Sequence, residues 1–136
     1  MAYKVMIVED DPLIRQGLGK MIFWEECGLE LTCTASNGRE ALQRMEDSEV
    51  DICITDIKMP QMDGIAFMKN CKAMGKAVSF IVLSGFAEFE LVKEAVQIGI
   101  ENYLVKPIDK EELIQTLVTV VDKLDARQKF MQSVMR

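Results

Sequence analysis

The sequence contains no histidine. This absence excludes Ser-His-Asp triads, histidine-ligated zinc sites and a role as a histidine phosphodonor. Long hydrophobic runs are missing too: no uncharged apolar stretch approaches the roughly 18 residues needed to span a bilayer, and no signal-peptide pattern opens the chain. We therefore expect a soluble cytoplasmic protein without a membrane segment.

Basic residues and closely spaced cysteines are also scarce. The 16 Lys and Arg are outnumbered by 22 Asp and Glu, giving a formal charge of −6, so we expect no direct binding to nucleic acid or to an anionic membrane. Cys27, Cys33, Cys53 and Cys71 show no CxxC spacing, and Cys33 and Cys53 have apolar neighbours. We interpret the four as reduced, small core residues of a cytosolic protein.

The chain does have enough apolar material for one core. Its 136 residues are about one domain's worth, and 49% hydrophobic with 28% charged residues is typical of a folded globular protein. No repeat, low-complexity tract or internal linker divides it. The function must therefore be built around a single hydrophobic core.

Short apolar runs alternate with helical patterns along the chain. The predicted strands are Val5–Val8, Leu29–Ala35, Asp51–Thr55, Phe80–Leu83 and Tyr103–Val105. Each strand is followed by apolar residues at helical spacing. The predicted helices begin near Pro12, after a turn at Asn37 and Gly38, near Gly64, at Glu88 and after the cap residue Asp109. Five such alternations predict a parallel sheet that right-handed crossovers cover on both faces.

The burial of two of these elements is also predicted. The fifth strand is short and is expected to lie buried. In the helix Glu88–Ile98, four residues are expected on the inner face: Leu91, Val92, Ala95 and Val96.

Polar residues stand at the strand ends. In a parallel sheet of this kind, ligands bind outside the carboxyl ends of the strands, near the point where the strand order reverses. Glu9 and Asp10 follow the first strand, Asp56 the third, Ser84 the fourth and Lys106 the fifth. Three carboxylates, a hydroxyl and an ammonium should therefore converge at one edge of the sheet.

The chemistry of this set points to phosphoryl transfer. Three carboxylates a few Å apart repel one another, so a cation is expected among them. Because histidine is absent, the ligands are hard oxygens, which favours Mg²⁺ over zinc or copper. A Mg²⁺ with open positions serves phosphate oxygens, and a lysine and a hydroxyl can hold a phosphoryl group. The set indicates transient formation of an aspartyl phosphate.

At these residues the chain closely resembles the receiver domain of two-component response regulators. The matching stretches are KVMIVEDDPLIRQGL, ICITDIKMPQMDGI, FIVLSG and NYLVKPI, in order and at the family's spacings. The resemblance implies an α/β, flavodoxin-like doubly wound (βα)5 fold whose five-stranded parallel sheet has the strand order 2-1-3-4-5. It also implies a phosphoacceptor switch, phosphorylated by a sensor histidine kinase with Mg²⁺, and no enzymatic role beyond its own phosphorylation and dephosphorylation.

The resemblance assigns the metal and acceptor residues by position. Asp56 would be the phosphoacceptor, Asp10 a direct Mg²⁺ ligand and Glu9 a ligand through water. Lys58 would contribute its backbone carbonyl to the metal. Asp11 falls just outside the metal position, and we interpret it as a charge at a helix N-terminus.

The resemblance also assigns the residues around the phosphoryl group. Lys106 would contact it, and Ser84 would contact its oxygen on activation. Tyr103 matches the aromatic switch position, which turns inward when the hydroxyl residue moves toward the phosphate; the alternative is a plain half-buried strand tyrosine. Pro107 would follow Lys106 in a cis peptide bond.

A narrower resemblance concerns the output. The stretches DPLIRQGL, FWEECGLE, ASNGREAL and SGFAEFELVKEAVQIGIENYLVKPID look like receivers that precede an AraC-type helix-turn-helix DNA-binding region. No such region is present in the sequence. We expect a receiver at residues 1–122 and a helical extension or linker at 123–136, cut from a longer chain that regulates transcription.

The last segment carries a coiled-coil spacing. Seven residues recur at alternating steps of four and three: Leu113, Leu117, Val120, Leu124, Arg127, Met131 and Val134. One interpretation is a helix that outruns the domain and forms a homodimer on phosphorylation. The other, preferred for the isolated chain, is a helix whose first half packs on the sheet and whose tail is a frayed or disordered linker.

Two other functional classes stay open on the residues alone. A phosphatase of haloacid-dehalogenase type also uses an aspartate nucleophile on a parallel sheet, but it needs a second aspartate two residues later, where this chain has Lys58. A flavin or nucleotide carrier of the same fold would need a glycine-rich or hydroxyl-rich phosphate loop after the first strand. Acids stand there instead.

Overall fold

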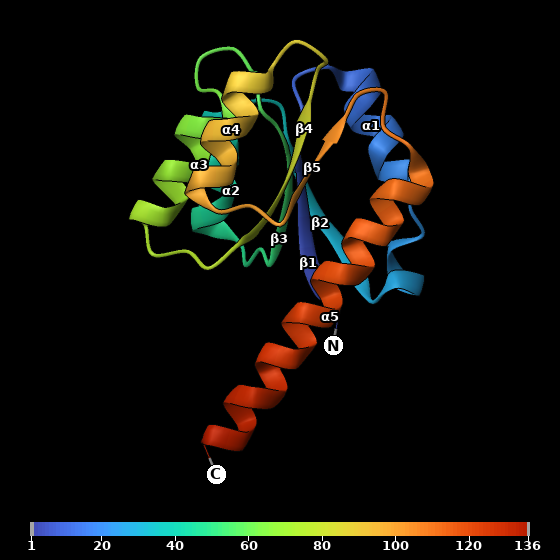
Figure 1. Ribbon diagram of the computed structural model, residues 1–136, viewed down its shortest axis with the longest axis vertical. Coiled ribbons are helices and arrows are strands. Elements are labelled where there is room, and N and C mark those ends of the chain that lie inside the picture. Colours follow the sequence, from blue (N-terminus) through green and yellow to red (C-terminus); the bar gives the residue numbers. More distant parts are fainter. Residues whose placement is uncertain (1, 136) are drawn as a thin grey trace.

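The computed structural model describes residues 2–135 and contains a five-stranded sheet between two layers of helices (Figure 1). The strands are β1 (Tyr3–Val8), β2 (Leu29–Ala35), β3 (Ile52–Asp56), β4 (Ser79–Ser84) and β5 (Asn102–Val105). They are all parallel, in the order β2-β1-β3-β4-β5. The predicted flavodoxin-like fold class is confirmed.

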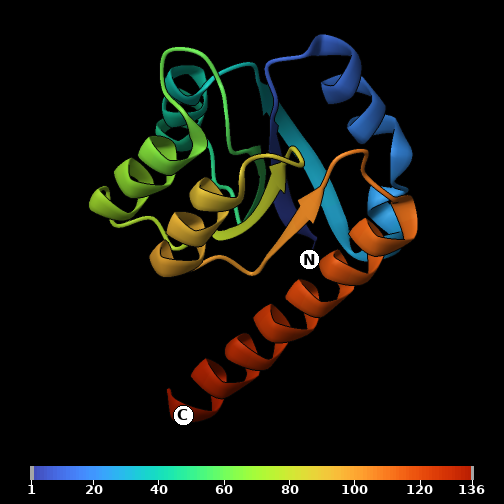
Figure 2. The same cartoon turned by 45° about the horizontal axis from the view of Figure 1, so that its top comes forward.

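Helices connect successive strands and cover both faces of the sheet. They are α1 (Pro12–Met21), α2 (Gly38–Asp47), α3 (Gly64–Ala73), α4 (Phe89–Ile98) and α5 (Lys110–Val134), with a short 3-10 helix, η1 (Trp24–Cys27), before β2. Figures 1 and 2 show α1 and α5 on one face and α2, α3 and α4 on the other. Across residues 2–135, none of the helices combines the length and apolar character that a bilayer span requires.

The central strands lie between two hydrophobic cores, one on each face of the sheet. Every residue of β3 and of β4 is buried, as expected for parallel strands that helices cover on both sides. On the α2–α4 side the rings of Phe67 and Phe80 meet edge to face, with 6.0 Å between their centroids. On the α1 and α5 side, Ile7 packs in the same cluster as Leu113 and Leu117. The strand ends are therefore held in place by packing on both faces.

Short polar side chains begin four of the five α-helices. Asp11, Asn37, Asp63 and Asp109 each accept a hydrogen bond from a backbone N–H in the first turn. Asp11 thus lies at the helix N-terminus, as we interpreted it. α4 differs, because its N-cap residue Glu88 makes no such side-chain hydrogen bond.

The two edge strands are less buried than predicted. In β5 only Leu104 is buried, while Tyr103 and Val105 are exposed, so the prediction of a buried fifth strand is wrong. In β2 the thiol residue Cys33 is half-buried rather than a core residue. An edge strand has only one neighbour in the sheet, and its apolar pattern alone does not reveal this position.

The inner face of α4 is narrower than predicted. Val92 and Ala95 are buried and Leu91 packs partly against the core, but Val96 is 55% exposed. The helix rests on β4 and α3 near the edge of the sheet, so a single stripe of its surface reaches the core. The assignment of Val96 to the inner face is therefore wrong.

α5 is one continuous helix of 25 residues that projects beyond the sheet (Figures 1 and 2). Leu113, Leu117 and Val120 are buried against the domain, whereas Met131 and Val134 are exposed. The helix therefore outruns the domain, and the alternative of a disordered tail does not apply through Val134. Pairing of this extension with a second copy stays a prediction.

A partly buried hydrogen bond ties α5 to the first strand. Tyr3 Oη donates to Asp125 Oδ1 at 2.6 Å. This bond, together with burial and the charge of Asp125, raises the pKa of Tyr3 to about 12. Because the folded-state pKa lies above the ordinary value of 10.0, the bond stabilises the fold fully below pH 10, and this stabilisation is lost as the pH rises toward 12.

We expect Tyr3→Phe to lower the free energy of unfolding by about 1 kcal/mol at pH 8, because Asp125 loses its donor. The difference from the wild type should shrink as the pH is raised above 10. Urea unfolding at several pH values measures both effects, with Tyr103→Phe as the control on an exposed tyrosine. Equal stability of Tyr3→Phe and the wild type at pH 8 would contradict the prediction.

Candidate functional site

Four strand ends bring the predicted site residues to one edge of the sheet. Glu9 directly follows β1, Asp56 ends β3, Ser84 ends β4 and Lys106 directly follows β5. Asp56 is paired in register with Leu83, the neighbour of Ser84. The parallel register therefore places the acceptor candidate beside the hydroxyl residue.

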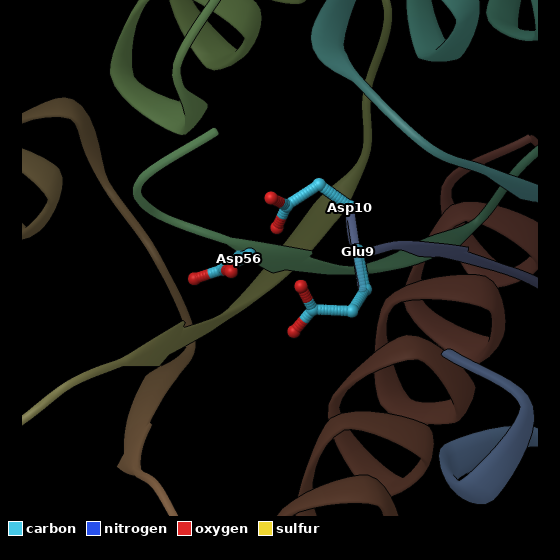
Figure 3. A group of neighbouring side chains, drawn as sticks. All are labelled: Glu9, Asp10 and Asp56. Atoms are coloured by element: carbon cyan, nitrogen blue, oxygen red, sulfur yellow. The ribbon is translucent and has the colours of Figure 1, made fainter. Parts of the chain in front are cut away.

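Three carboxylates gather at this edge (Figure 3). One oxygen from each of Glu9, Asp10 and Asp56 lies within 4.8 Å of the other two. The Glu9 residue is fully buried and Asp56 is 4% exposed, whereas Asp10 lies open to solvent. Negative charge is thus concentrated in a place that is only partly hydrated.

Lys106 supplies a counter-charge from the neighbouring strand end. Its Nζ lies 2.8 Å from Glu9 Oε1 and 2.9 Å from Asp56 Oδ2. Burial lowers the pKa of Lys106, but the hydrogen bonds to Glu9 and Asp56 outweigh it, so the pKa is raised overall. The sequence predicts a metal ion as the neutralising cation, whereas the structure shows that Lys106 provides part of the positive charge.

Asp10 experiences the negative charge that remains. Partial loss of hydration, a hydrogen bond with Glu9 and the charge of Glu9 raise the pKa of the Asp10 carboxyl, although the charge of Lys106 acts in the opposite direction. A further positive charge would therefore stabilise the ionised site. Carboxylate oxygens at this spacing are the donors that Mg²⁺ prefers, so the residues fit a divalent cation.

The other predicted site residues surround this cluster. Ser84 is buried, and its backbone oxygen accepts a hydrogen bond from Lys106 N at 2.8 Å. Tyr103 is 45% exposed, and the Lys58 residue is exposed on the loop after β3. The Lys106–Pro107 peptide bond is cis, the geometry that the resemblance implies. An inward turn of Tyr103 and metal ligation by the Lys58 carbonyl stay predictions.

Sequence reasoning misses Gly64 as part of the site. A Cβ on this residue would lie 2.6 Å from the backbone oxygen of Asp56 and 2.9 Å from Cα of Ile57. Gly64 N donates to Ile57 O at 2.8 Å and closes the loop between β3 and α3. Only glycine lets this loop pack so tightly behind Asp56. The available signal is the Asp63–Gly64 pair, a dipeptide typical of turns.

Sequence comparisons agree with this geometry. The model of the response regulator receiver domain family matches residues 5–118. The uncharacterized transcriptional regulatory protein YesN of Bacillus subtilis (strain 168) is 40% identical over 122 residues, which are 90% of this chain and 33% of that protein. The chemotaxis protein CheY of Treponema pallidum (strain Nichols) is 30% identical over 121 residues, 88% of this chain and 83% of that protein. The chain thus spans only a third of the YesN protein.

Solved structures lead to the same family. The REC domain of AraT, a response regulator from Geobacillus stearothermophilus, superposes with a TM-score of 0.88 at 34% identity and covers 94% of this chain and 99% of that one. A two component transcriptional regulator AraC from Clostridium phytofermentans ISDg gives 0.82 at 30% identity, with 93% and 98% covered. This chain belongs to the response regulator receiver domain family, the phosphoacceptor switches of two-component signalling.

Proposed function

We propose that Asp56 is the phosphoacceptor of this receiver and that Glu9 and Asp10 help to hold Mg²⁺ beside it. The supporting observation is the cluster of three carboxylate oxygens within 4.8 Å, with Lys106 Nζ hydrogen-bonded to Glu9 and Asp56. Receivers bind Mg²⁺ at an acidic pocket, and this cluster is a pocket of that kind. The aspartyl phosphate predicted from the sequence forms here.

Each residue has a distinct task in the transfer. A carboxylate oxygen of Asp56 attacks phosphorus in line, while the bond from phosphorus to the donor's histidine nitrogen breaks and its electron pair leaves with that nitrogen. Lys106 Nζ already donates a hydrogen bond to Asp56 Oδ2. Its positive charge stabilises the negative charge that spreads onto the phosphoryl oxygens during the transfer. Bound Mg²⁺ supplies further neutralisation of those oxygens. The same groups would support loss of the phosphoryl group to water.

The signal passes through β4, α4 and β5. Ser84 moves toward the phosphoryl group and donates a hydrogen bond to it, and the loop after β4 follows. Tyr103, exposed on β5, then turns inward, so that the surface made by these elements repacks. Phosphorylation acts by shifting the population between two packings of this surface.

The expected partner is a sensor histidine kinase. An apolar groove between α1 and the β5–α5 loop suits it, and its lining residues are Ile14, Gly17, Leu18, Met21, Lys106, Pro107 and Ile108. Since Lys106 belongs both to this groove and to the ion pair with Asp56, a kinase helix seated in the groove would bring its phosphohistidine toward the acceptor.

The output lies outside the receiver. We propose that residues 1–122 form the receiver unit, that 123–136 lead to an output domain, and that this domain is of the AraC type and regulates transcription. The greater length of the YesN protein and the likeness to the AraC regulator support this. The exposed Met131 and Val134 on α5 support a homodimer on phosphorylation. The cytoplasmic location stays a prediction.

Incubation with acetyl phosphate tests the proposed chemistry. We expect the intact mass to increase by one phosphoryl group in Mg²⁺ and to change little in EDTA, because Lys106 alone then faces the charge of three carboxylates and the incoming phosphoryl group. Mg²⁺ without a phosphodonor should raise the melting temperature. Equal phosphorylation with and without Mg²⁺ would contradict the metal site, and no phosphorylation in either case would contradict the acceptor site.

A further inference from the structure

The loop between β4 and α4 holds a carboxylate that neither the site nor the core explains. Glu88 Oε1 lies over Gly85, 2.8 Å from the position that a Cβ would take there. The other oxygen, Oε2, is buried and has no hydrogen-bond donor among residues 2–135. A carboxylate oxygen in this situation is unfavourable, because it has lost its hydration without gaining a partner.

The usual roles of a glutamate at this position do not account for its placement. Glu88 is the N-cap residue of α4, but its side chain makes no capping hydrogen bond. None of the ion pairs in the described part of the chain includes it. Its backbone is fixed, since its N–H donates to Gly85 O at 3.3 Å and its carbonyl accepts from Val92 N at 3.1 Å. The side chain is therefore folded back over the loop without a capping hydrogen bond or an ion pair.

This loop begins at the residue that responds to the phosphoryl group in the proposed function. Gly85 follows Ser84 directly, and the backbone oxygen of Ser84 accepts a hydrogen bond from Lys106 N. The Glu88 carboxylate thus lies on the segment that moves when Ser84 approaches the phosphoryl group. Any loop conformation that returns this carboxylate to water relieves the unfavourable burial.

We propose that Glu88 is a positioning residue that biases the β4–α4 loop toward the activated conformation, by destabilising the conformation in which its carboxylate is folded onto Gly85. It acts on the equilibrium between two loop conformations and does not touch the phosphoryl group. Removing the carboxylate stabilises the folded-back loop, so a phosphoryl analogue binds more weakly. The inference rests on the proposed function, because binding of the analogue at Asp56 is one of its readouts.

Glu88→Ala tests the proposal, with Glu90→Ala as the matched control on an exposed glutamate in the first turn of α4. We expect Glu88→Ala to melt at a higher temperature than the wild type and to bind beryllofluoride in Mg²⁺ about tenfold more weakly. Glu90→Ala should change neither quantity by as much. A merely structural role predicts a lower melting temperature, and direct repulsion of the anion by Glu88 predicts tighter binding in its absence. Either result would overturn the proposal.

Gly85→Ala approaches the same contact from the other side. The new Cβ would meet Glu88 Oε1 at 2.8 Å and push the flexible carboxylate out of its buried position. We expect tighter beryllofluoride binding, and we expect this gain to vanish in the Glu88→Ala background. A gain of equal size in both backgrounds would show that the methyl group acts without Glu88, and would overturn the proposal.

Different results would contradict the assignment of Asp56 as the phosphoacceptor and the inference about Glu88. A wild-type protein that binds no beryllofluoride would contradict the assignment of Asp56, whatever Glu88 does. The melting temperatures do not depend on that assignment. If Glu88→Ala melts no higher than Glu90→Ala, the folded-back carboxylate does not destabilise the loop, and the inference about Glu88 is overturned.

Discussion

Asp56→Asn should take up no phosphoryl group from acetyl phosphate under conditions that phosphorylate the wild type. The amide has the size of the carboxylate but lacks the anionic oxygen that attacks phosphorus. Asp56 is 4% exposed and hydrogen-bonded to Lys106, so no exposed carboxylate on the helices shares its surroundings. Intact mass spectrometry measures the loss, which we expect to be complete.

The control for this variant is Asp47→Asn, an exposed aspartate at the end of α2. It removes the same charge away from the strand ends and should be phosphorylated like the wild type. A cooperative urea transition shows that both variants are folded. Wild-type phosphorylation of Asp56→Asn would place the acceptor elsewhere, and Asp10, exposed in the same cluster, would be the next residue to test.

Lys106→Met should lower the free energy of unfolding strongly in the absence of a metal ion. The variant keeps a side chain of similar length but leaves the buried carboxylates of Glu9 and Asp56 without the ammonium that lies 2.8 and 2.9 Å from them. Breaking a buried ion pair by removing one partner costs about 3 kcal/mol or more. We expect a loss of about 3 kcal/mol in the free energy of unfolding at pH 7 in EDTA, the lower end of the range, because the Lys106 side chain is 25% exposed.

Mg²⁺ should restore part of this stability. With Lys106 gone, a divalent ion takes over the neutralisation of the three carboxylates, so Mg²⁺ should stabilise the variant more than the wild type. Urea unfolding in EDTA and in Mg²⁺ measures both effects, and Lys129→Met on the exposed part of α5 is the control. A variant as stable as the wild type in EDTA would show that the ion pair contributes little, and our account of the charge balance would then be wrong.

The fold and the membership of the site could be predicted because both follow from local pattern and sheet geometry. Continuous apolar runs mark β3 and β4, and parallel strands end at one edge, which is enough to bring Glu9, Asp56 and Lys106 together. The atomic pairing could not be predicted in the same way. Lys106 lies 50 residues from Asp56 and 97 from Glu9 in the chain, and only the packed sheet decides which oxygens its ammonium reaches.

Burial at the edges and in loops was harder to predict. The exposure of Tyr103 and Val96 depends on which elements pack beside β5 and α4. The spacing of apolar residues along the sequence does not reveal these neighbours. Glu88 looks in the sequence like an ordinary residue at a helix start. Its buried oxygen results from a side-chain conformation folded onto Gly85, which only atomic coordinates reveal.

Two contacts anchor α5 to the sheet at the point where the helix begins to extend beyond the domain. Asp125 is held by Tyr3, and Lys123 is held by Glu101 at 3.0 Å, directly before β5. Past Asp125 the helix continues for about nine residues, or roughly 14 Å at 1.5 Å per residue. A tilt of about 10° at Asp125 would displace the end of the helix at Val134 by roughly 2 Å. Because these contacts anchor α5 near Asp125, a small tilt of the helix there would produce a larger displacement at Val134.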